Sequence, residues 1–271
     1  SLSPRLLNIN EGSSAPDWMH SNALDYNVHK DIIALNSPEM DEFYFIDHST
    51  TTVEAASSSG GNFGFGGDFL FRWGNPIIYG QGTVNDQRLF YQHDVHWIKE
   101  GLPDAGKIML FNNRLNGATK SAVYIIEPDT TSDGDFDLTA GIFGPSLPFW
   151  TYELPIQLSS YIVSGAQRLP NGNTLICSGK NGIYIEIDPL DTIVWRYTLP
   201  ISVSNGIITQ GTVDQSQPLF NARRYSENFP GFTGKILTPG PKIELNPTNN
   251  CTCYENGVYI SEKNIFDFEL Y

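Results

Sequence analysis

Three histidines lie in short motifs that could carry chemistry. His20 closes the segment 17–20 (Asp-Trp-Met-His), while His93 and His96 lie in the segment 92–97 (Gln-His-Asp-Val-His-Trp). Neutral imidazole is a nucleophile and a proton acceptor near pH 7, and the protonated ring can hold an anion. His93 and His96 are three residues apart, a spacing that points the side chains of a regular strand to opposite faces. We therefore expect His20 and His93 to share one site, with His96 directed toward the packing between sheets or the rim.

The elements that position these histidines form an internal repeat. Each repeat opens with a segment that carries candidate residues, continues with an apolar strand and a strand ending in an acidic residue, and closes with a Trp-containing strand before a proline. The closing strands are 71–76, 149–155 and 194–200. Four strands in a meander are typical of one blade of a β-propeller. The predicted blades cover residues 18–76, 91–155, 161–200 and, less regularly, 218–271.

The repeat predicts an all-β fold, a β-propeller of four-stranded antiparallel blades in a single domain over residues 1–271. Asn-Gly pairs such as 116–117 and 181–182 supply residues that accept the positive φ of tight hairpins. Four blades are the low end for closing a ring, and residue 1 carries no start signal. We therefore expect the later part of a larger propeller, whose ring is completed by missing N-terminal blades or by a second chain. A β-sandwich of short strands is the alternative, but it leaves the recurring strand order unexplained.

The position of the histidines in the repeat favours a function over a packing role. A single histidine beside a tryptophan is more often a hydrogen-bonded packing residue than a catalyst. His20 and His93, however, stand at equivalent places in the opening segments of successive blades. The opening strands of a propeller line its central channel, so the two imidazoles are expected to converge there.

The overall charge restricts the partners. Sixteen Lys and Arg stand against 30 Asp and Glu, which gives a net charge of −14. Binding of nucleic acid needs a basic face, so this balance argues against it, and it also disfavours anionic membrane surfaces. No apolar run reaches about 18 residues, so we expect no membrane span. An anionic ligand would need locally placed arginines and histidines to overcome the global field.

The cysteines and an acidic segment could each have a structural role or bind a metal. The chain has three cysteines, Cys177, Cys251 and Cys253, so at least one is left without a disulfide partner. A disulfide from Cys177 to one of the other two requires an oxidising compartment, and a zinc site is a weaker alternative. A structural or free-thiol role is favoured. The acidic segment 129–137 alternates carboxylates around a glycine, as calcium loops do. Its spacing fits no strict EF-hand, so a solvated hairpin loop is favoured. We expect no metal and no cofactor.

Five segments resemble the bacterial arylsulfotransferase (aryl-sulfate sulfotransferase) family, and in particular its secreted branch. They are residues 17–22, 46–52, 67–76, 92–97 and 164–176. The resemblance covers nearly the whole chain and is strongest over about 15–225. It implies a six-bladed propeller. It also implies a transferase activity that moves a sulfuryl group from an aryl sulfate to a phenol without a nucleotide sulfate donor. A periplasmic or secreted location also suits the acidic composition.

The resemblance assigns roles residue by residue. His20 matches the family's Asp-Trp-x-His motif and His93 its Gln-His motif, so both are the expected catalytic residues, as sulfate-binding or acid/base groups. The family's nucleophilic histidine comes from a later blade, where this chain has Ser164, and no histidine follows His96. The candidates for substrate binding are His96, Arg114 (with Lys120 as competitor), Gln167, Arg168, Arg223 and Arg224.

Two functions therefore stay open at the level of sequence. The first is a sulfotransferase acting on a small aryl sulfate and a phenol through a histidine-lined channel. The second is a non-catalytic secreted propeller that binds an anionic or sulfated ligand or a protein partner, which the missing histidine at Ser164 favours.

Overall fold

The computed structural model describes residues 2–11, 16–209, 211–214, 219–226, 228–238, 245–246, 253–255 and 258–260. The chain divides into two compact units. The first comprises Ser1–Glu100 with Asp104–Ile162, and the second comprises Gly101–Pro103 with Val163–Tyr271. Each unit is described by itself below.

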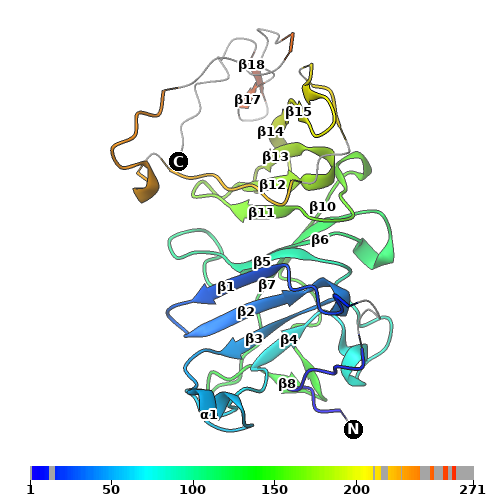
Figure 1. Cartoon of the computed structure of the whole chain (residues 1–271), viewed down its shortest axis with the longest axis vertical. Helices are drawn as coiled ribbons and strands as arrows, with labels where there is room; N and C mark the ends of the chain where they lie inside the picture. Colours follow the sequence, from blue (N-terminus) through cyan, green and yellow to red (C-terminus); the bar gives the residue numbers. More distant parts are fainter. Residues whose placement is uncertain are drawn as a thin grey trace. The chain divides into compact units, whose positions relative to one another are not determined.

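Three four-stranded antiparallel sheets dominate the described residues, as the repeat predicted. In the first sheet, sequential neighbours pair in the order β1 (Ala23–Asn27), β2 (Ile32–Ser37), β3 (Glu42–Asp47) and β4 (Phe71–Trp73), and Figure 1 shows them side by side. The second sheet contains β5 (His93–Trp97), β6 (Ile108–Asn112), β7 (Ala122–Ile126) and β10 (Trp150–Glu153). The third contains β11 (Gly165–Arg168), β12 (Thr174–Ser178), β13 (Ile183–Ile187) and β14 (Ile193–Thr198).

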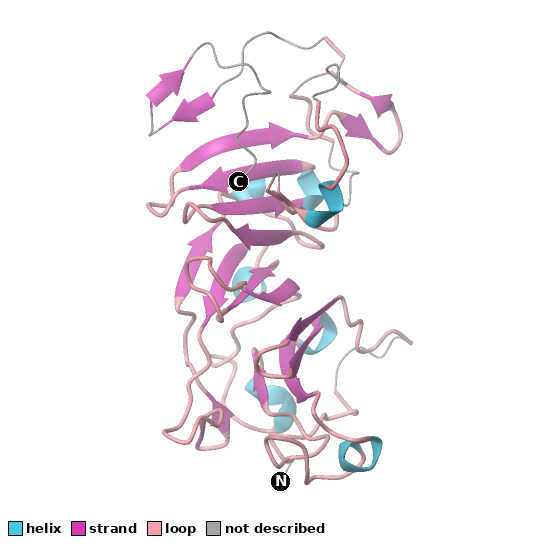
Figure 2. Ribbon diagram, turned by 90° about the vertical axis from the view of Figure 1, so that its left-hand side faces the viewer, coloured by secondary structure: helices cyan, strands magenta, loops and turns pink. Residues whose placement is uncertain are grey.

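The other described elements are short hairpins and single helical turns (Figure 2). The hairpins pair β8 (Leu138–Thr139) with β9 (Ile142–Phe143), β15 (Ile201–Ser202) with β16 (Gly206–Ile207), and β17 (Cys253–Glu255) with β18 (Val258–Ile260). The helical turns are α1 (Thr52–Ala55), η1 (Pro38–Met40), η2 (Pro76–Tyr79), η3 (Leu115–Gly117), η4 (Ile156–Leu158), η5 (Gly179–Asn181) and η6 (Pro230–Phe232). Among the described residues of the fourth predicted blade, 218–271, the strands are β17 and β18 alone. Every helical segment in the described part of the chain is too short to cross a bilayer.

The first two sheets pack face to face around an aromatic core. Side chains alternate between the faces of a strand, so Phe45 of β3 and Phe71 of β4 point to the same face. They join Trp97 of β5 and Leu110 of β6 in one buried cluster. The ring centroids of Phe45 and Trp97 lie 5.0 Å apart. This apolar contact holds the two sheets against each other.

A polar junction joins the start of β5 to the inner strands of the first sheet. Gln92 is fully buried, and its Nε2 donates to Asn36 Oδ1 at 2.7 Å and to Glu42 O at 2.9 Å. The backbone oxygen of Gln92 accepts from Asn22 Nδ2 at 3.1 Å and from Asn36 Nδ2 at 2.9 Å. Residues 20–22 and 91–93 therefore lie close together, although about seventy residues of sequence separate them.

A buried ion pair fixes the outer strand of the first sheet. Arg72 on β4 and Glu42 on β3 are both 0% exposed, and two guanidinium nitrogens of Arg72 bond the two carboxylate oxygens. Arg72 also donates to Leu6 O at 2.9 Å and lies 4.0 Å from the ring centroid of Tyr79. The arginine therefore ties the N-terminal segment to the sheet and has a structural role.

Glu42→Gln is expected to lower the free energy of unfolding by about 3–5 kcal/mol, because it leaves a buried guanidinium without its counter-charge. Urea unfolding followed by circular dichroism measures the change. Glu153→Gln is the matched control, because its pair with Lys120 is roughly half exposed and should contribute less than about 1 kcal/mol. Equal losses in the two variants would contradict the assigned role of Arg72.

Candidate functional site

His93 is buried at the start of β5 and is held in one orientation. Its Nδ1 lies 2.8 Å from Asn113 Oδ1 and 3.2 Å from Tyr91 O, and the whole residue is 3% exposed. Both neighbours are acceptors, so Nδ1 carries the proton of the neutral ring and Nε2 carries the lone pair. Burial lowers the pKa of His93, although the bonds to Asn113 and Tyr91 partly oppose this. The imidazole is therefore neutral at pH 7, with Nε2 as its basic atom.

His20, like His93, has its Nδ1 bonded to an acceptor. Its Nδ1 is hydrogen-bonded to the carboxylate of Asp17, and its side chain is 42% exposed. The bond to a carboxylate places a proton on Nδ1 and leaves Nε2 as the reactive nitrogen. A charge on His20 is one of the smaller causes of the lowered pKa of His93. The hydrogen bond from Asn22 to Gln92 brings the segments that carry His20 and His93 together within the first unit.

His96 contradicts the expectation that it faces away from His93. His93 pairs with Phe111 and His96 pairs with Met109, so three steps along β5 match two steps along β6. This register shift is a β-bulge, and Asp94 within it adopts a φ of 61°. Cross-strand partners share a face, and Phe111 and Met109 are two residues apart, so both histidines lie on the same face. The extra residue overturns the period-two prediction.

Arg114 lies two residues beyond the end of β6. Its guanidinium carbon is 4.0 Å from the ring centroid of Tyr91, and its Nε donates to Tyr161 O at 3.3 Å. Tyr91 in turn lies with its ring centroid 5.8 Å from that of His93. Lys120, the competing candidate, pairs with Glu153 on the surface instead. The arginine therefore belongs with the histidines.

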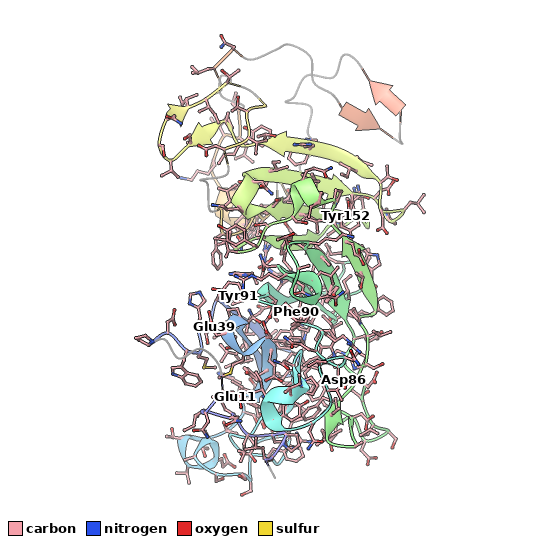
Figure 3. All side chains as sticks on the ribbon, turned by 90° about the vertical axis from the view of Figure 1, so that its right-hand side faces the viewer. Glu11, Glu39, Asp86, Phe90, Tyr91 and Tyr152 are labelled. Atoms are coloured by element: carbon pink, nitrogen blue, oxygen red, sulfur yellow. The ribbon has the colours of Figure 1, made fainter. Side chains whose placement is uncertain are left out.

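Two carboxylates that sequence reasoning missed complete the group. Figure 3 shows the labelled residues Glu39 and Tyr91 next to each other, and after burial the charge of Glu39 is a cause of the raised pKa of Tyr91. Asp41 Oδ1 accepts from Tyr91 N at 2.6 Å. Burial raises the pKa of Asp41 to about 6, while Tyr91 N and the charge on Arg114 oppose the shift. We call the following set the histidine cluster: Asp17, His20, Glu39, Asp41, Tyr91, His93, Asn113 and Arg114.

Gln167 and Arg224 were expected to bind substrate, and the structure places both in the second unit, bonded to each other. Gln167 Nε2 donates to Arg224 O at 2.9 Å, and Gln167 Oε1 accepts from Arg224 N at 2.6 Å. The side-chain amide thus pairs with the backbone of the 219–226 segment as a neighbouring strand would. Arg224 Nη1 also lies 2.6 Å from Glu186 Oε2. These contacts hold the segment on the third sheet.

Arg168, Arg223 and Ser164 also have structural partners in the second unit. Arg168 Nη1 donates to Thr174 Oγ1 at 2.7 Å, and Arg223 Nη1 donates to Ala166 O at 3.1 Å. Ser164 is 0% exposed, and its Oγ accepts from the backbone N–H of residue 179 at 2.9 Å. Its φ of 86° is rare for a residue with a side chain. Ser164 therefore serves the turn into the third sheet.

The acidic segment and the cysteines offer no metal site in the described residues. Asp137 N donates to Asp129 O at 2.9 Å, and Thr139 Oγ1 donates to Asp137 Oδ2 at 3.0 Å, so the segment closes on itself as a hairpin loop. Across the part of the chain that the structure describes, no three His, Cys, Asp or Glu side chains gather as metal ligands would. Cys177 is buried on β12. Cys251 lies outside the described residues, and only the backbone of Cys253 is described.

The lowered pKa of His93 predicts a pH dependence of stability. The unfolded ring takes up a proton below about pH 6.5, whereas the buried ring resists it, so protonation favours unfolding. The stabilisation is therefore complete above about pH 6.5 and is lost as the pH falls toward the folded pKa. His93→Asn should flatten the decline in melting temperature between pH 7.5 and 5. The exposed His29→Asn control should keep the wild-type decline, and a His93 variant with the same decline would refute the assignment.

Comparisons with known proteins assign no family to the chain. No family model matches it, and no curated protein matches it. Nineteen chains of solved structures match, among them the crystal structure of a protein of unknown function from Bacteroides caccae. That match has a TM-score of 0.27 at 10% identity and covers 70% of this chain and 65% of the other. The chain thus spans less than two thirds of that protein, and neither fold nor function follows from so weak a likeness.

Proposed function

We propose that the chain is an arylsulfotransferase-like enzyme that transfers a sulfuryl group from an aryl sulfate to a phenol at the histidine cluster. The observation that carries the proposal is the hydrogen bond from Asn22 to Gln92, which brings the segments of His20 and His93 together, with Nδ1 of each ring anchored to an acceptor. The motifs around both histidines resemble the family in which such residues act on sulfate esters. No cofactor is required, and the partners are a small aryl sulfate and a phenol.

The two imidazoles suit both proton transfers of the reaction. The sulfur–oxygen bond to the donor phenol breaks and a new sulfur–oxygen bond forms to the acceptor. The neutral Nε2 of His93 can take the proton of the acceptor hydroxyl, and a protonated His20 can give a proton to the departing phenolate. Arg114 supplies positive charge for the sulfate oxygens, as arginine does in phosphoryl transfer. Direct transfer fits this chain better than a covalent intermediate, because the third sheet has Ser164 where the family has its nucleophile.

A propeller would account for the arrangement of the sheets. We place the three sheets as successive blades, supported by their common strand order, by the face-to-face packing of the first two, and by the junction of Gln92 with the preceding sheet. Further blades or a second chain would complete the ring. A bacterial periplasmic or secreted location is part of the same proposal.

His93→Asn should lower the rate of sulfuryl exchange between 4-nitrophenyl sulfate and a phenol by at least about a hundredfold, because proton transfer by one positioned side chain contributes about 10²–10⁴-fold. His29→Asn, in an exposed turn, should keep the wild-type rate. Release of 4-nitrophenolate measures the reaction, and circular dichroism checks that each variant is folded. Wild-type activity in the His93 variant would exclude His93 from catalysis.

A second candidate is a propeller that binds a sulfated ligand without turnover. The observation that favours it is the buried and bonded state of Ser164 at the nucleophile position. On this alternative, calorimetry at low salt would detect 4-nitrophenyl sulfate binding to the wild-type protein, while no nitrophenolate would be released. Mass-spectrometric detection of a sulfated protein or a sulfated acceptor would rule the alternative out.

A further inference from the structure

We propose that a cavity on the third sheet binds a planar aromatic molecule. The cavity has a volume of about 350 Å³ and lies within the second unit. This volume is within the range of about 300–1,000 Å³ that small-molecule sites occupy. The residues that line it include Tyr184, Trp195, Arg223, Arg224, Tyr225 and Phe232.

The wall on the sheet is a ladder of stacked rings. Tyr184 on β13 pairs with Tyr197 on β14, and their ring centroids lie 6.2 Å apart with 24° between the planes. Trp195 stacks beside Tyr197 at 6.1 Å and 11°. The rings come from adjacent strand positions on one face, so the sheet fixes their spacing. A flat ligand can lie on this wall without reordering it.

Another part of the lining comes from the segment that Gln167 and Arg224 hold on the sheet. Tyr225 lies 4.4 Å from Phe229 and 6.4 Å from Phe232, measured between ring centroids. These mutual contacts hold the aromatic residues in place. Aromatic rings from two segments in the lining of one cavity favour a planar guest, because stacked and edge-to-face pairs stabilise more than apolar burial alone.

Two arginines line the cavity, Arg223 and Arg224, and both have hydrogen-bond partners of their own. The guanidinium carbon of Arg224 is 5.7 Å from the ring centroid of Trp195, and its Nη1 is 2.6 Å from Glu186 Oε2. The carboxylate offsets the charge of Arg224, and Arg223 Nη1 donates to the backbone oxygens of Ala166 and Ala222 at 3.1 Å. The aromatic rings therefore remain the groups that select the guest. The site uses residues of the second unit alone and does not depend on sulfuryl transfer at the histidine cluster.

Calorimetry with the full chain tests the proposal, with 2-naphthol as the planar probe and 2-decalol as its saturated counterpart of similar size. We expect 2-naphthol to bind at least tenfold more tightly than 2-decalol. Trp195→Leu should weaken the binding of 2-naphthol roughly tenfold, because it removes one stacked wall. Trp150→Leu is the matched control, since Trp150 stacks on Tyr152 in the equivalent outer strand, 6.3 Å apart, and should bind like wild type.

Trp195→Phe keeps the proposal testable if the leucine variant fails to fold. This variant retains a ring, so it should bind 2-naphthol within threefold of wild type while losing the quenching of indole fluorescence that binding produces. Absence of 2-naphthol binding in the wild-type protein would overturn the proposal. Equal binding of the two probes, quenching that persists in Trp195→Phe, or equal losses in the two leucine variants would also overturn it.

Discussion

The buried side chain of Gln92 is the contact on which the arrangement of the first unit depends. The amide nitrogen and the backbone oxygen of Gln92 bond Asn22, Asn36 and Glu42, so they connect two sheets through groups that have left water, whereas its amide oxygen is buried without a bond among the described residues. A buried polar group without a hydrogen bond costs free energy. The relative position of the two sheets that allows these hydrogen bonds is therefore strongly preferred over shifted positions that would break them. The next residue in the chain is His93. Its position beside the loop that carries His20 follows directly from this junction.

The same junction sets the chemistry of the cluster. Desolvation keeps His93 neutral, while Asn113 and Tyr91 fix which nitrogen carries the proton. The more exposed His20 has a carboxylate partner instead. Two imidazoles in different environments can divide the roles of base and acid between them. In a chain with a net charge of −14, Arg114 on the Tyr91 ring provides the local positive charge that an anion needs.

Local signals explain why the sheets were predictable and the details of the site were not. Alternating apolar residues and turn pairs specify each hairpin, so the four-stranded order followed from the sequence. No residue pattern marks the bulge at Asp94, because aspartate adopts a positive φ only occasionally. The face of the strand on which His96 lies was therefore predicted wrongly. Glu39 and Tyr91 meet through tertiary packing between segments about fifty residues apart, which no periodicity marks. The residue types of Gln167 and Arg224 suggested contacts with a ligand. Their hydrogen bonds instead hold the segment 219–226 on the third sheet.

The most direct test of a shared histidine site is nitrogen NMR of the ¹⁵N-labelled chain during titration with 4-nitrophenyl sulfate. Long-range proton–nitrogen spectra report the Nε2 atom of each histidine separately. The account predicts that the signals of His20 and His93 shift together along one binding curve, while that of His29 stays unchanged. Shifts of the two rings that follow different curves, or the absence of any shift at His93, would contradict it.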